Sequence, residues 1–363
     1  HPAFEIIVVA DPRGMAVVTS PEIKRVPFDE PNIAKARNAG LAQAAGDVVA
    51  FVDDDAVPEP TWLSRLTAPL SNPQIAAAGG VVRDRDGISL QWGAAAANAL
   101  AERLPLEADP AEISLHKGRP GHAIRTEGTN CAFQREILAG IGGFDPVFRF
   151  YLDETDVNMR LAAEGHVTAI VPNAVVQHGF AASARRFADR APRDLRDIGA
   201  STIAFMRKHT QADDPLAPQI AKMIAEQRAR LIRHMVSGGL EPRDVNRLMA
   251  TLMAGIVDGG VAEIAPLPPI EAKTEIAPFP SRPRPGVFLA GRIWQAGPLR
   301  KKAAQAAADG NIVTLLLLSP TARPHRVSFH PDGSWEQRGG LFGRAGREGP
   351  RVRFWSFSAR LRH

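Results

Sequence analysis

One segment of the chain joins a strand-like run to a dense group of negative charges. Residues 48–52 are apolar and rich in β-branched side chains, and Asp53, Asp54 and Asp55 follow directly. Adjacent carboxylates repel one another, and the apolar run supplies no cation to offset them. In open α/β sheets, ligands bind beyond the carboxyl ends of the strands. The segment therefore predicts a divalent metal that holds the phosphates of a nucleotide; a solvated acidic turn is the alternative.

The neighbouring segments indicate a sheet with crossover helices. Residues 4–9 read as a strand, and a turn over residues 10–14 contains a carboxylate, Asp11, at the strand's end. Residues 33–45 are rich in helix formers, and Gly46 and Asp47 end that helix before the next strand. Strand, helix and strand in this order predict a parallel sheet.

Four stretches of the chain carry a resemblance to a known family. They read FEIIVVAD, AKARNAGLAQAAGDVVAFVDDDAVPEPTWL, EGTNCAFQREILAGIGGFDPVF and YLDETDVNMRLAAEGH, and they cover roughly residues 4–180. In order and spacing they resemble glycosyltransferase family 2, whose members use nucleotide sugars and have the GT-A fold. The resemblance implies an α/β protein with a Rossmann-like, mixed and mostly parallel sheet flanked by helices. The family begins with a strand and helix before FEIIVV, so we expect the sequence to be a fragment that lacks part of the nucleotide-binding edge.

The resemblance also implies roles for the acidic triplet. Asp53 and Asp55 match the family's Asp-x-Asp pair, with Asp55 as the direct ligand of Mn²⁺ or Mg²⁺. Asp54 matches a carboxylate that faces the ribose or the metal. His178 matches a histidine that completes the metal shell in related enzymes, although a lone histidine at a strand end is more often a hydrogen-bonded surface residue.

Further nucleotide-sugar contacts follow from the same resemblance. Asp11 matches the carboxylate that reads the nucleobase, and Arg37 matches a basic residue near the base or the phosphates. Gly128 and Asn130 lie in a turn that lets the backbone approach the donor sugar. The turn at Gly142–Gly143 has the same composition, and a turn without function is its alternative.

A second carboxylate group lies far along the chain, in residues 153–156. The family has Glu-Asp in this register, whereas this chain has Asp153 and Glu154. We expect Glu154, with Asp153 beside it, to be the general base of an inverting single displacement. Acids in the first turn of a helix also favour its dipole. Asp156 and Arg160 have the spacing of a simple ion pair on a helix.

Composition limits the class of protein. The chain has 363 residues, which leaves room for a core domain and smaller units. Cys131 is the single cysteine, which excludes an internal disulfide and fits a reducing, cytoplasmic setting. No apolar run is long enough to span a bilayer; the longest obvious one covers residues 312–318.

The pattern beyond the core predicts three further parts. We expect a GT-A catalytic domain over residues 1–182 and a helical region over 183–262, with helices ended by Gly238–Gly239 and Gly259–Gly260. A Pro-rich linker follows over 263–285. Residues 286–363 read as a small basic α/β unit of unknown role that contains a β-hairpin around a Pro-Asp-Gly turn.

The basic residues are unevenly spread. The formal net charge is +5, and Arg185, Arg186, Arg190, Arg193 and Arg196 are close together after the catalytic core. Two interpretations are open: a solvated surface, or a peripheral contact with the inner face of an anionic membrane. No nucleic-acid-binding module accompanies the cluster, so a nucleic-acid partner is not expected.

These observations predict a glycosyltransferase that moves a sugar from a nucleoside-diphosphate sugar to a hydroxyl of a cell-envelope or lipid-linked glycan. A nucleotidyltransferase that makes sugar nucleotides shares the sheet and the metal chemistry. A non-catalytic sugar-binding or scaffold module is the alternative from another class. Donor hydrolysis with and without metal separates the three.

Overall fold

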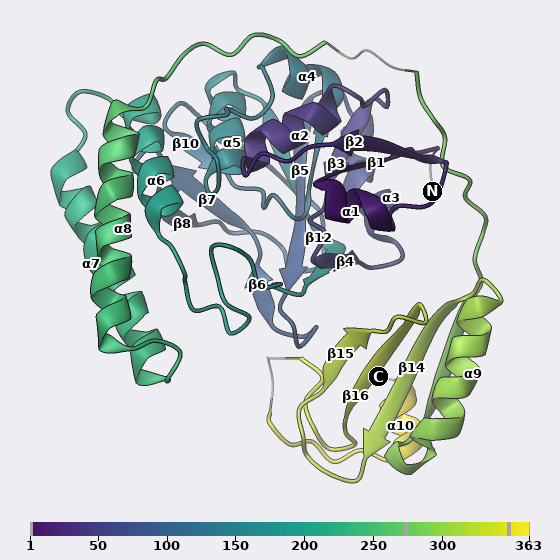
Figure 1. Ribbon diagram of the computed structural model, residues 1–363. Helices are drawn as coiled ribbons and strands as arrows, with labels where there is room; N and C mark the ends of the chain where they lie inside the picture. The colour runs from purple at the N-terminus through teal and green to yellow at the C-terminus, as the bar shows by residue number, and fades with distance from the viewer. Residues whose placement is uncertain (1–2, 272–274, 347–349, 363) are drawn as a thin grey trace.

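The chain forms an α/β core, a group of three long helices beside it and a small sheet unit joined by an extended segment (Figure 1). This computed structural model describes residues 3–271, 275–346 and 350–362. The mixed α/β fold class predicted from the sequence, with its helical region and small C-terminal sheet, is confirmed.

The first two strands, β1 (Ile6–Ala10) and β2 (Ile23–Pro27), pair in parallel in a sheet of their own. The turn expected after β1 is a short helix, α1 (Pro12–Val17), because Asp11 caps it by accepting a hydrogen bond from Gly14 N at 2.8 Å. Asn32 caps the crossover helix α2 (Ile33–Leu41) in the same way.

The main sheet has the order β3-β11-β5-β12-β4, with β6 beside β5 and β9 beside β12. Its strands are β3 (Val48–Phe51), β4 (Ala56–Pro58), β5 (Ile75–Arg83), β6 (Leu90–Trp92), β9 (Ser114–Lys117), β11 (Cys131–Gln134) and β12 (Val167–His178). Pairing is mixed, as predicted, but among the described strands of this sheet only β5 and β12 are parallel. The other described pairs are antiparallel, and β11 lies antiparallel between β3 and β5 after a long excursion of the chain.

Helices cover both faces of this sheet. The helices α2, α4 (Arg135–Gly140) and α5 (Asp153–Ala163) contribute to one core cluster, in which the rings of Phe51, Phe133 and Phe144 meet edge to face at 5.1–6.3 Å. The helix α3 (Trp62–Thr67) and the 3₁₀ turn η1 (Ala68–Ser71) pack on the other face. A smaller sheet, β10-β7-β8, comes from the excursion and has strands β7 (Ala95–Asn98), β8 (Arg103–Pro105) and β10 (His122–Ile124).

The helical region consists of α6 (Arg196–His209), α7 (Leu216–Val236) and α8 (Pro242–Val261). The prediction that Gly259–Gly260 ends a helix is wrong, because α8 continues through both. Glycines of α8 instead allow α6 to approach closely. A Cβ on Gly255 would lie 2.0 Å from Arg196 O, and one on Gly259 would lie 2.4 Å from Ala200 O.

The Pro-rich segment after α8 lies along the core without regular secondary structure in its described residues. Ile270 N donates to Ala139 O at 2.9 Å, and Phe279 N donates to Phe4 O at 2.7 Å. The rings of Phe4 and Phe279 stack at 5.7 Å. The segment is therefore held on the core at several points between α8 and the small unit.

The small unit is a four-stranded sheet of order β13-β14-β16-β15. Its elements are β13 (Gly286–Arg292), η2 (Ile293–Gln295), α9 (Ala296–Ala308), β14 (Ile312–Ser319), β15 (Arg326–Phe329), β16 (Ser334–Gly340) and α10 (Phe357–Arg362). The strands β13, β14 and β16 are parallel, and β15 and β16 form the predicted hairpin. At the β15 edge, Val327 N donates to Asp86 O of the core at 2.8 Å, beside a hollow of about 210 Å³ that Asp84, Arg85, Asp86 and Arg326 line.

Within the described residues, every helix is too short or too polar to cross a lipid bilayer.

Candidate functional site

Two carboxylates and an imidazole meet where β3 ends. Asp53 and Asp55 lie in the turn between β3 and β4, and β4 pairs with the end of β12 so that His178 lies opposite Ala56. Ligand atoms of Asp53, Asp55 and His178 all lie within 4.8 Å of one another. This donor set of two carboxylates and one imidazole suits Mn²⁺ or Mg²⁺.

The orientation of His178 is set by two partners. Its Nε2 lies 2.9 Å from Asp55 Oδ1, and its Nδ1 lies 3.2 Å from Gln91 Oε1. Without a metal, Nε2–H is placed to donate to the Asp55 carboxylate, and the contact of Nδ1 with Gln91 holds the ring so that Nε2 faces the carboxylates, as in metal-binding histidines. The ring also packs on Phe180, with centroids 4.1 Å apart.

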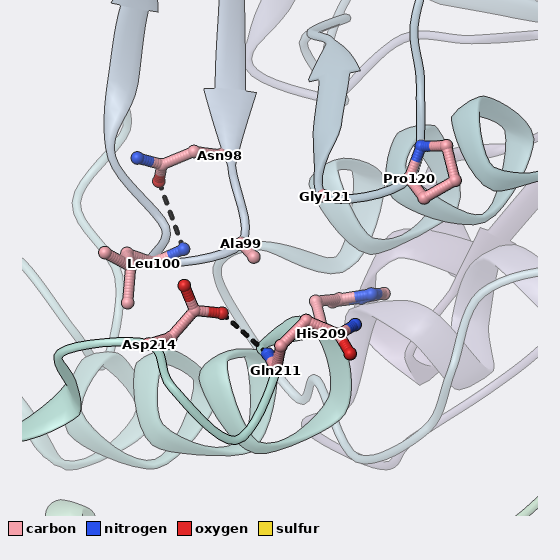
Figure 2. A pocket seen from close by; sticks show the side chains of 8 residues that line it. All are labelled: Asn98, Ala99, Leu100, Pro120, Gly121, His209, Gln211 and Asp214. Carbon is pink, nitrogen blue, oxygen red and sulfur yellow. Dashed lines mark hydrogen bonds between the residues drawn. The ribbon is translucent and has the colours of Figure 1, made fainter.

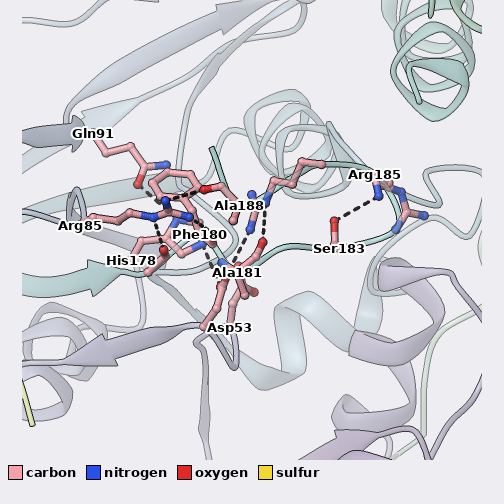
Figure 3. Close-up of polar contacts among 12 residues, drawn as sticks. Asp53, Arg85, Gln91, His178, Phe180, Ala181, Ser183, Arg185 and Ala188 are labelled. Carbon is pink, nitrogen blue, oxygen red and sulfur yellow. Dashed lines mark hydrogen bonds and ion pairs between the residues drawn. The ribbon is translucent and has the colours of Figure 1, made fainter. Parts of the chain in front are cut away.

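The loop after β12, residues 179–193, lies on the carboxylates (Figure 3). Ala181 N and Arg186 Nη2 each lie 2.8 Å from Asp55 Oδ2 and donate to it. Burial alone would raise the pKa of Asp55, but His178, the Ala181 amide and Arg186 hold it below its usual value. Arg186 thus places a positive charge beside a carboxylate of the candidate metal cluster.

Arg85, in the turn between β5 and β6, holds this loop. Its guanidinium donates to the carbonyls of Gly179, at 2.5 Å, Ala188, at 2.6 Å, and Phe180 (Figure 3). Arg190 of the loop forms an ion pair with Asp84 and lies over the Phe180 ring. The loop and the β5–β6 turn therefore form one connected structure.

Arg37 on α2 connects the two carboxylate groups predicted from the sequence. Its buried guanidinium lies 3.3 Å from Asp53 Oδ1 and forms an ion pair with Asp153. Gly128 makes room for it, because a Cβ there would lie 2.4 Å from Arg37 Nη2. Burial, together with the neighbouring Glu154 carboxylate, raises the pKa of Asp153 to about 7 against the attraction of Arg37.

Glu154 lies in the first turn of α5, close to charged groups of the segment between β10 and β11. Arg125 Nη2 is 3.7 Å from Glu154 Oε1 and 3.4 Å from Glu127 Oε1, and burial raises the pKa of Glu127. Arg125 Nε, Glu127 Oε1 and Thr129 Oγ1 are buried without a hydrogen-bond partner. Polar atoms of this kind usually bind water or a ligand.

The backbone before Glu154 is strained. Tyr151 and Leu152 have φ angles of 75° and 66°, in the left-handed region that non-glycine residues rarely adopt. Two such residues in succession direct α5 toward the carboxylates, and strain of this kind is concentrated at functional sites.

The remaining predicted residues lie as follows. Asp54 is exposed beside the cluster, and Asp11 caps α1 at the end of β1. Asn130 is fully buried: its Oδ1 accepts from Trp62 Nε1 at 2.7 Å and its Nδ2 donates to the carbonyls of Val81 and Ala174 at 2.9 Å. The structure thus gives Asn130 a structural role in joining strands. Gly142 and Gly143, with φ of 83° and 67°, end α4 and contact the Pro-rich segment and Asn38.

Two further expectations have clear outcomes. The predicted pairing of Asp156 with Arg160 is confirmed at 2.9 Å, and Lys208 and His209 of α6 join it.

The cluster of five arginines is not a free basic surface. Arg185, Arg186, Arg190 and Arg196 form ion pairs with Asp197, Asp55, Asp84 and Asp258, and Arg193 lies over the Phe187 ring.

A hollow of about 380 Å³ lies beside His209, the partner of Asp156 (Figure 2). It is lined by Asn98, Ala99, Leu100, Pro120, Gly121, His209, Gln211 and Asp214. None of the predicted site residues lines it.

Sequence reasoning missed five side chains of the site. They are Arg85, Gln91, Arg125, Glu127 and Arg186. Glu127 stands directly before Gly128 and could have been found as a third acid near the motifs. The partners of the other four come from distant segments, and no local pattern marks them.

Comparisons with known proteins show which family the chain resembles. The family described as "Glycosyltransferase like family 2" matches residues 1–200. The chain is 23% identical over 283 residues to the O-antigen biosynthesis protein RfbC of Myxococcus xanthus, a match that covers 65% of this chain and 22% of that protein. It is 31% identical over 115 residues to a glucosyl-dolichyl phosphate glucuronosyltransferase of Haloferax volcanii, which covers 31% of this chain and 34% of that protein. Residues 1–349 of S. aureus TarS, solved with UDP, align with a TM-score of 0.40 and 14% identity, covering 70% of this chain and 79% of that one.

The α/β core with its carboxylate–imidazole cluster lies within the part of the chain that this family matches. The family match spans more than half of the chain, and the chain belongs to glycosyltransferase family 2. It covers between about a fifth and a third of the curated relatives that it matches.

Proposed function

We propose that this protein transfers a sugar from a nucleoside-diphosphate sugar to an acceptor hydroxyl by a metal-dependent, inverting single displacement. One observation carries the proposal: Arg37 holds the Asp53–Asp55 group and the Asp153–Glu154 group in a single site. A cation site for the leaving diphosphate and a separate carboxylate for the acceptor proton are what such a displacement requires.

Asp55, Asp53 and His178 would hold the divalent metal, which supplies positive charge to the diphosphate as its bond to the sugar breaks. Gln91 keeps His178 Nε2 directed to that position. Arg186 is close enough to add a second positive charge at the same place. We assign the ribose to the exposed Asp54 and the nucleobase to Asp11.

Glu154 would accept the proton of the acceptor hydroxyl. Its carboxylate forms a hydrogen bond with the Asp153 carboxyl group and has longer contacts with Thr155 Oγ1 at 3.4 Å and Arg125 Nη2 at 3.7 Å, so it is not committed to a close ion pair. Asp153, by contrast, is buried in an ion pair with Arg37 and positions that arginine. We assign the donor-sugar contacts to the turn that contains Gly128 and to the neighbouring Glu127. The buried Asn130 stabilises that turn.

The acceptor is proposed to be a cell-envelope or lipid-linked glycan, in line with the O-antigen and dolichyl-phosphate relatives. We assign the catalytic domain to residues 1–182, with the helical region over 183–262, the linker over 263–285 and the small unit over 286–363 as its extensions.

A panel of nucleotide sugars tests the proposal. Purified protein with Mn²⁺ should release a nucleoside diphosphate from one donor, faster with acceptor than by hydrolysis, and the product should have the inverted anomeric configuration. Retention of configuration would exclude the single displacement. Release of pyrophosphate from a nucleoside triphosphate and a sugar phosphate would indicate a nucleotidyltransferase. Binding of a donor without turnover would indicate a non-catalytic module.

A further inference from the structure

Positive charge in this chain is concentrated in the small C-terminal unit. Residues 286–363 contain 13 Lys and Arg against 4 Asp and Glu, a net charge of +9. The remaining residues contain 31 Lys and Arg against 35 Asp and Glu. The small unit is therefore a strongly cationic module on a slightly acidic body, and this separation is independent of the proposed reaction.

Aromatic and basic side chains gather at one edge of the small unit. Because β13, β14 and β16 are parallel, their carboxyl ends meet at the same edge. Arg292 is the last residue of β13, and Trp294 follows it in η2. Arg323 follows β14, and its carbonyl accepts from Gly340 N at 2.9 Å at the end of β16. The segment 351–354 is held there too, since Arg353 N donates to Phe342 O at 3.0 Å.

These side chains are unusually exposed for their type. Phe354 is 87% exposed and Trp294 is 67% exposed, and Val352 nearby is 49% exposed. Arg292 lies over Trp294 and over Phe357 of α10, at 5.9 and 4.3 Å from the ring centroids. We call Arg292, Trp294, Arg323, Arg351, Arg353 and Phe354 the aromatic edge. Apolar side chains with this exposure among cations mark an interaction surface.

The acidic groups that the structure describes in the unit lie elsewhere. Asp309 precedes β14 and Asp332 precedes β16, so both lie at the amino ends of the strands. Glu336 is buried and paired with Arg300 at 2.7 Å. Among the described residues, none of the arginines of the aromatic edge has a carboxylate partner. Within the described part of the unit, the edge is therefore cationic and has no neighbouring carboxylate that offsets its charge.

The aromatic edge is free of the catalytic core. The core touches the unit at β15, which lies at the other side of the sheet from β13. Figure 1 shows the arrowhead of β14 at the lower end of the unit, the end away from the core. A partner at this edge would leave the carboxylate site open.

We propose that the aromatic edge docks on a membrane surface rich in anionic phospholipid. Trp and Phe favour the interfacial zone of a bilayer, and each Arg near an anionic surface adds an attraction of its own. The aliphatic Val352 beside Phe354 adds apolar area that becomes buried in a bilayer. Nucleic-acid bases stack on flat aromatic faces, so an aliphatic side chain favours a bilayer over a nucleic acid as the partner. Docking would place the enzyme at the surface where a lipid-linked acceptor lies.

Vesicle co-sedimentation of the full chain tests this proposal. We expect binding to phosphatidylcholine vesicles that contain about 30% phosphatidylglycerol, weak binding to pure phosphatidylcholine, and loss of binding when salt rises from about 0.05 to 0.5 M. The double variant W294S/F354S should bind about tenfold or more weakly. The double variant R351Q/R353Q should lose about fivefold for each arginine, the equivalent of about 1 kcal/mol each.

Two control variants lie off the edge. Phe288→Ser removes another exposed Phe of the same unit, 57% exposed on β13, and Arg243→Gln removes an exposed arginine of α8. Both should bind vesicles like the unchanged chain. Thermal unfolding and donor binding of the edge variants should be unaltered, since the substituted side chains are exposed and far from the carboxylates.

Failure of the unchanged chain to bind anionic vesicles at low salt would overturn the proposal. Equal binding by the edge variants and the controls would overturn it as well. Binding to single-stranded RNA or to heparin without binding to vesicles would show that the partner is a soluble polyanion. None of these results depends on whether sugar transfer is observed.

Discussion

Arg37 is the residue on which the geometry of the site most depends. It is buried, contacts carboxylates from two distant motifs and lies over the rings of Phe51 and Phe144, at 6.0 and 5.3 Å from their centroids. A buried cation is stable only when its partners remain in place. Arg37 therefore fixes Asp153, and with it the start of α5, relative to the turn after β3.

Substitution of Glu154 should impair proton transfer without changing donor binding. Glu154→Gln keeps the size of the side chain but cannot accept a proton, so transfer should fall by about 10²-fold or more. Donor affinity should stay the same. Initial rates and donor titration calorimetry on the two proteins measure both quantities.

Asp153→Asn is the matched comparison for Glu154. It should leave Arg37 with one carboxylate fewer and lower stability as well as activity, because Asp153 acts through Arg37. A stable, inactive Asp153→Asn protein beside an active Glu154→Gln protein would move the general base to Asp153.

At the scale of elements, Asp156 ties α5 to α6. The carboxylate is fully buried and contacts Arg160, Lys208 and His209 at 2.8–2.9 Å. Burial alone would raise its pKa, but these cations hold the pKa well below its ordinary value of 3.8. A group with a lowered pKa stabilises the fold above its unfolded pKa, and this contribution is lost as the pH falls below that value.

Asp156→Asn should lower the free energy of unfolding at neutral pH by about 3–5 kcal/mol, because it leaves buried cations without a full partner. Urea unfolding measures the change. The difference between the two proteins should shrink as the pH is lowered through 4 toward 2. Asp258→Asn, which breaks the exposed pair with Arg196, should cost less than about 1 kcal/mol. An equal cost for both would show that the buried network adds nothing.

The close contact between α6 and α8 predicts how alanine substitutions of the α8 glycines affect stability. Gly255→Ala places a Cβ against the backbone of α6, so it should destabilise the protein by about 1–3 kcal/mol through overpacking. Gly260→Ala meets nothing within 4 Å and should leave stability unchanged or raise it by up to about 1 kcal/mol. Thermal unfolding of both variants measures whether each substitution lowers or raises stability. Unchanged stability of the Gly255→Ala protein would mean that α6 and α8 separate easily.

These elements also show what the sequence could predict. Local patterns located β3, α2, the hairpin of β15 and β16, and α7 and α8, since each depends on neighbouring residues. The continuation of α8 through Gly259 was not predictable, because close packing on α6 outweighs the low helix propensity of glycine. The antiparallel direction of β11 depends on a long excursion that leaves no periodic signal.

The same limit holds for the site. Asp53, Asp55 and Glu154 stand in contiguous acidic runs, and such runs are visible in a single sequence. Arg186 was interpreted as part of a basic cluster, and only the folded chain shows that it contacts Asp55 at 2.8 Å. The pairing of Asn130 with Trp62 is equally invisible, because the two residues are 68 positions apart.

At the scale of the whole molecule, separate segments converge on one edge of the main sheet. The turn after β3, the end of β12, the loop over residues 179–193 and the start of α5 all contribute to the carboxylate site. The Pro-rich segment crosses the core, and the cationic small unit contacts the same β5–β6 turn that holds the loop through Arg85. The catalytic core and its extensions are thus physically connected around the site.

The central claim is that Asp53, Asp55 and His178 bind a divalent metal for a nucleotide sugar. Its most direct test is Mn²⁺ binding, measured by electron paramagnetic resonance in the presence of the nucleoside diphosphate that the donor panel selects. We predict that Asp55→Asn remains folded but loses Mn²⁺ binding, while Asp54→Asn, at the exposed neighbour outside the cluster, retains Mn²⁺. Unchanged Mn²⁺ affinity in the Asp55→Asn protein would contradict the account.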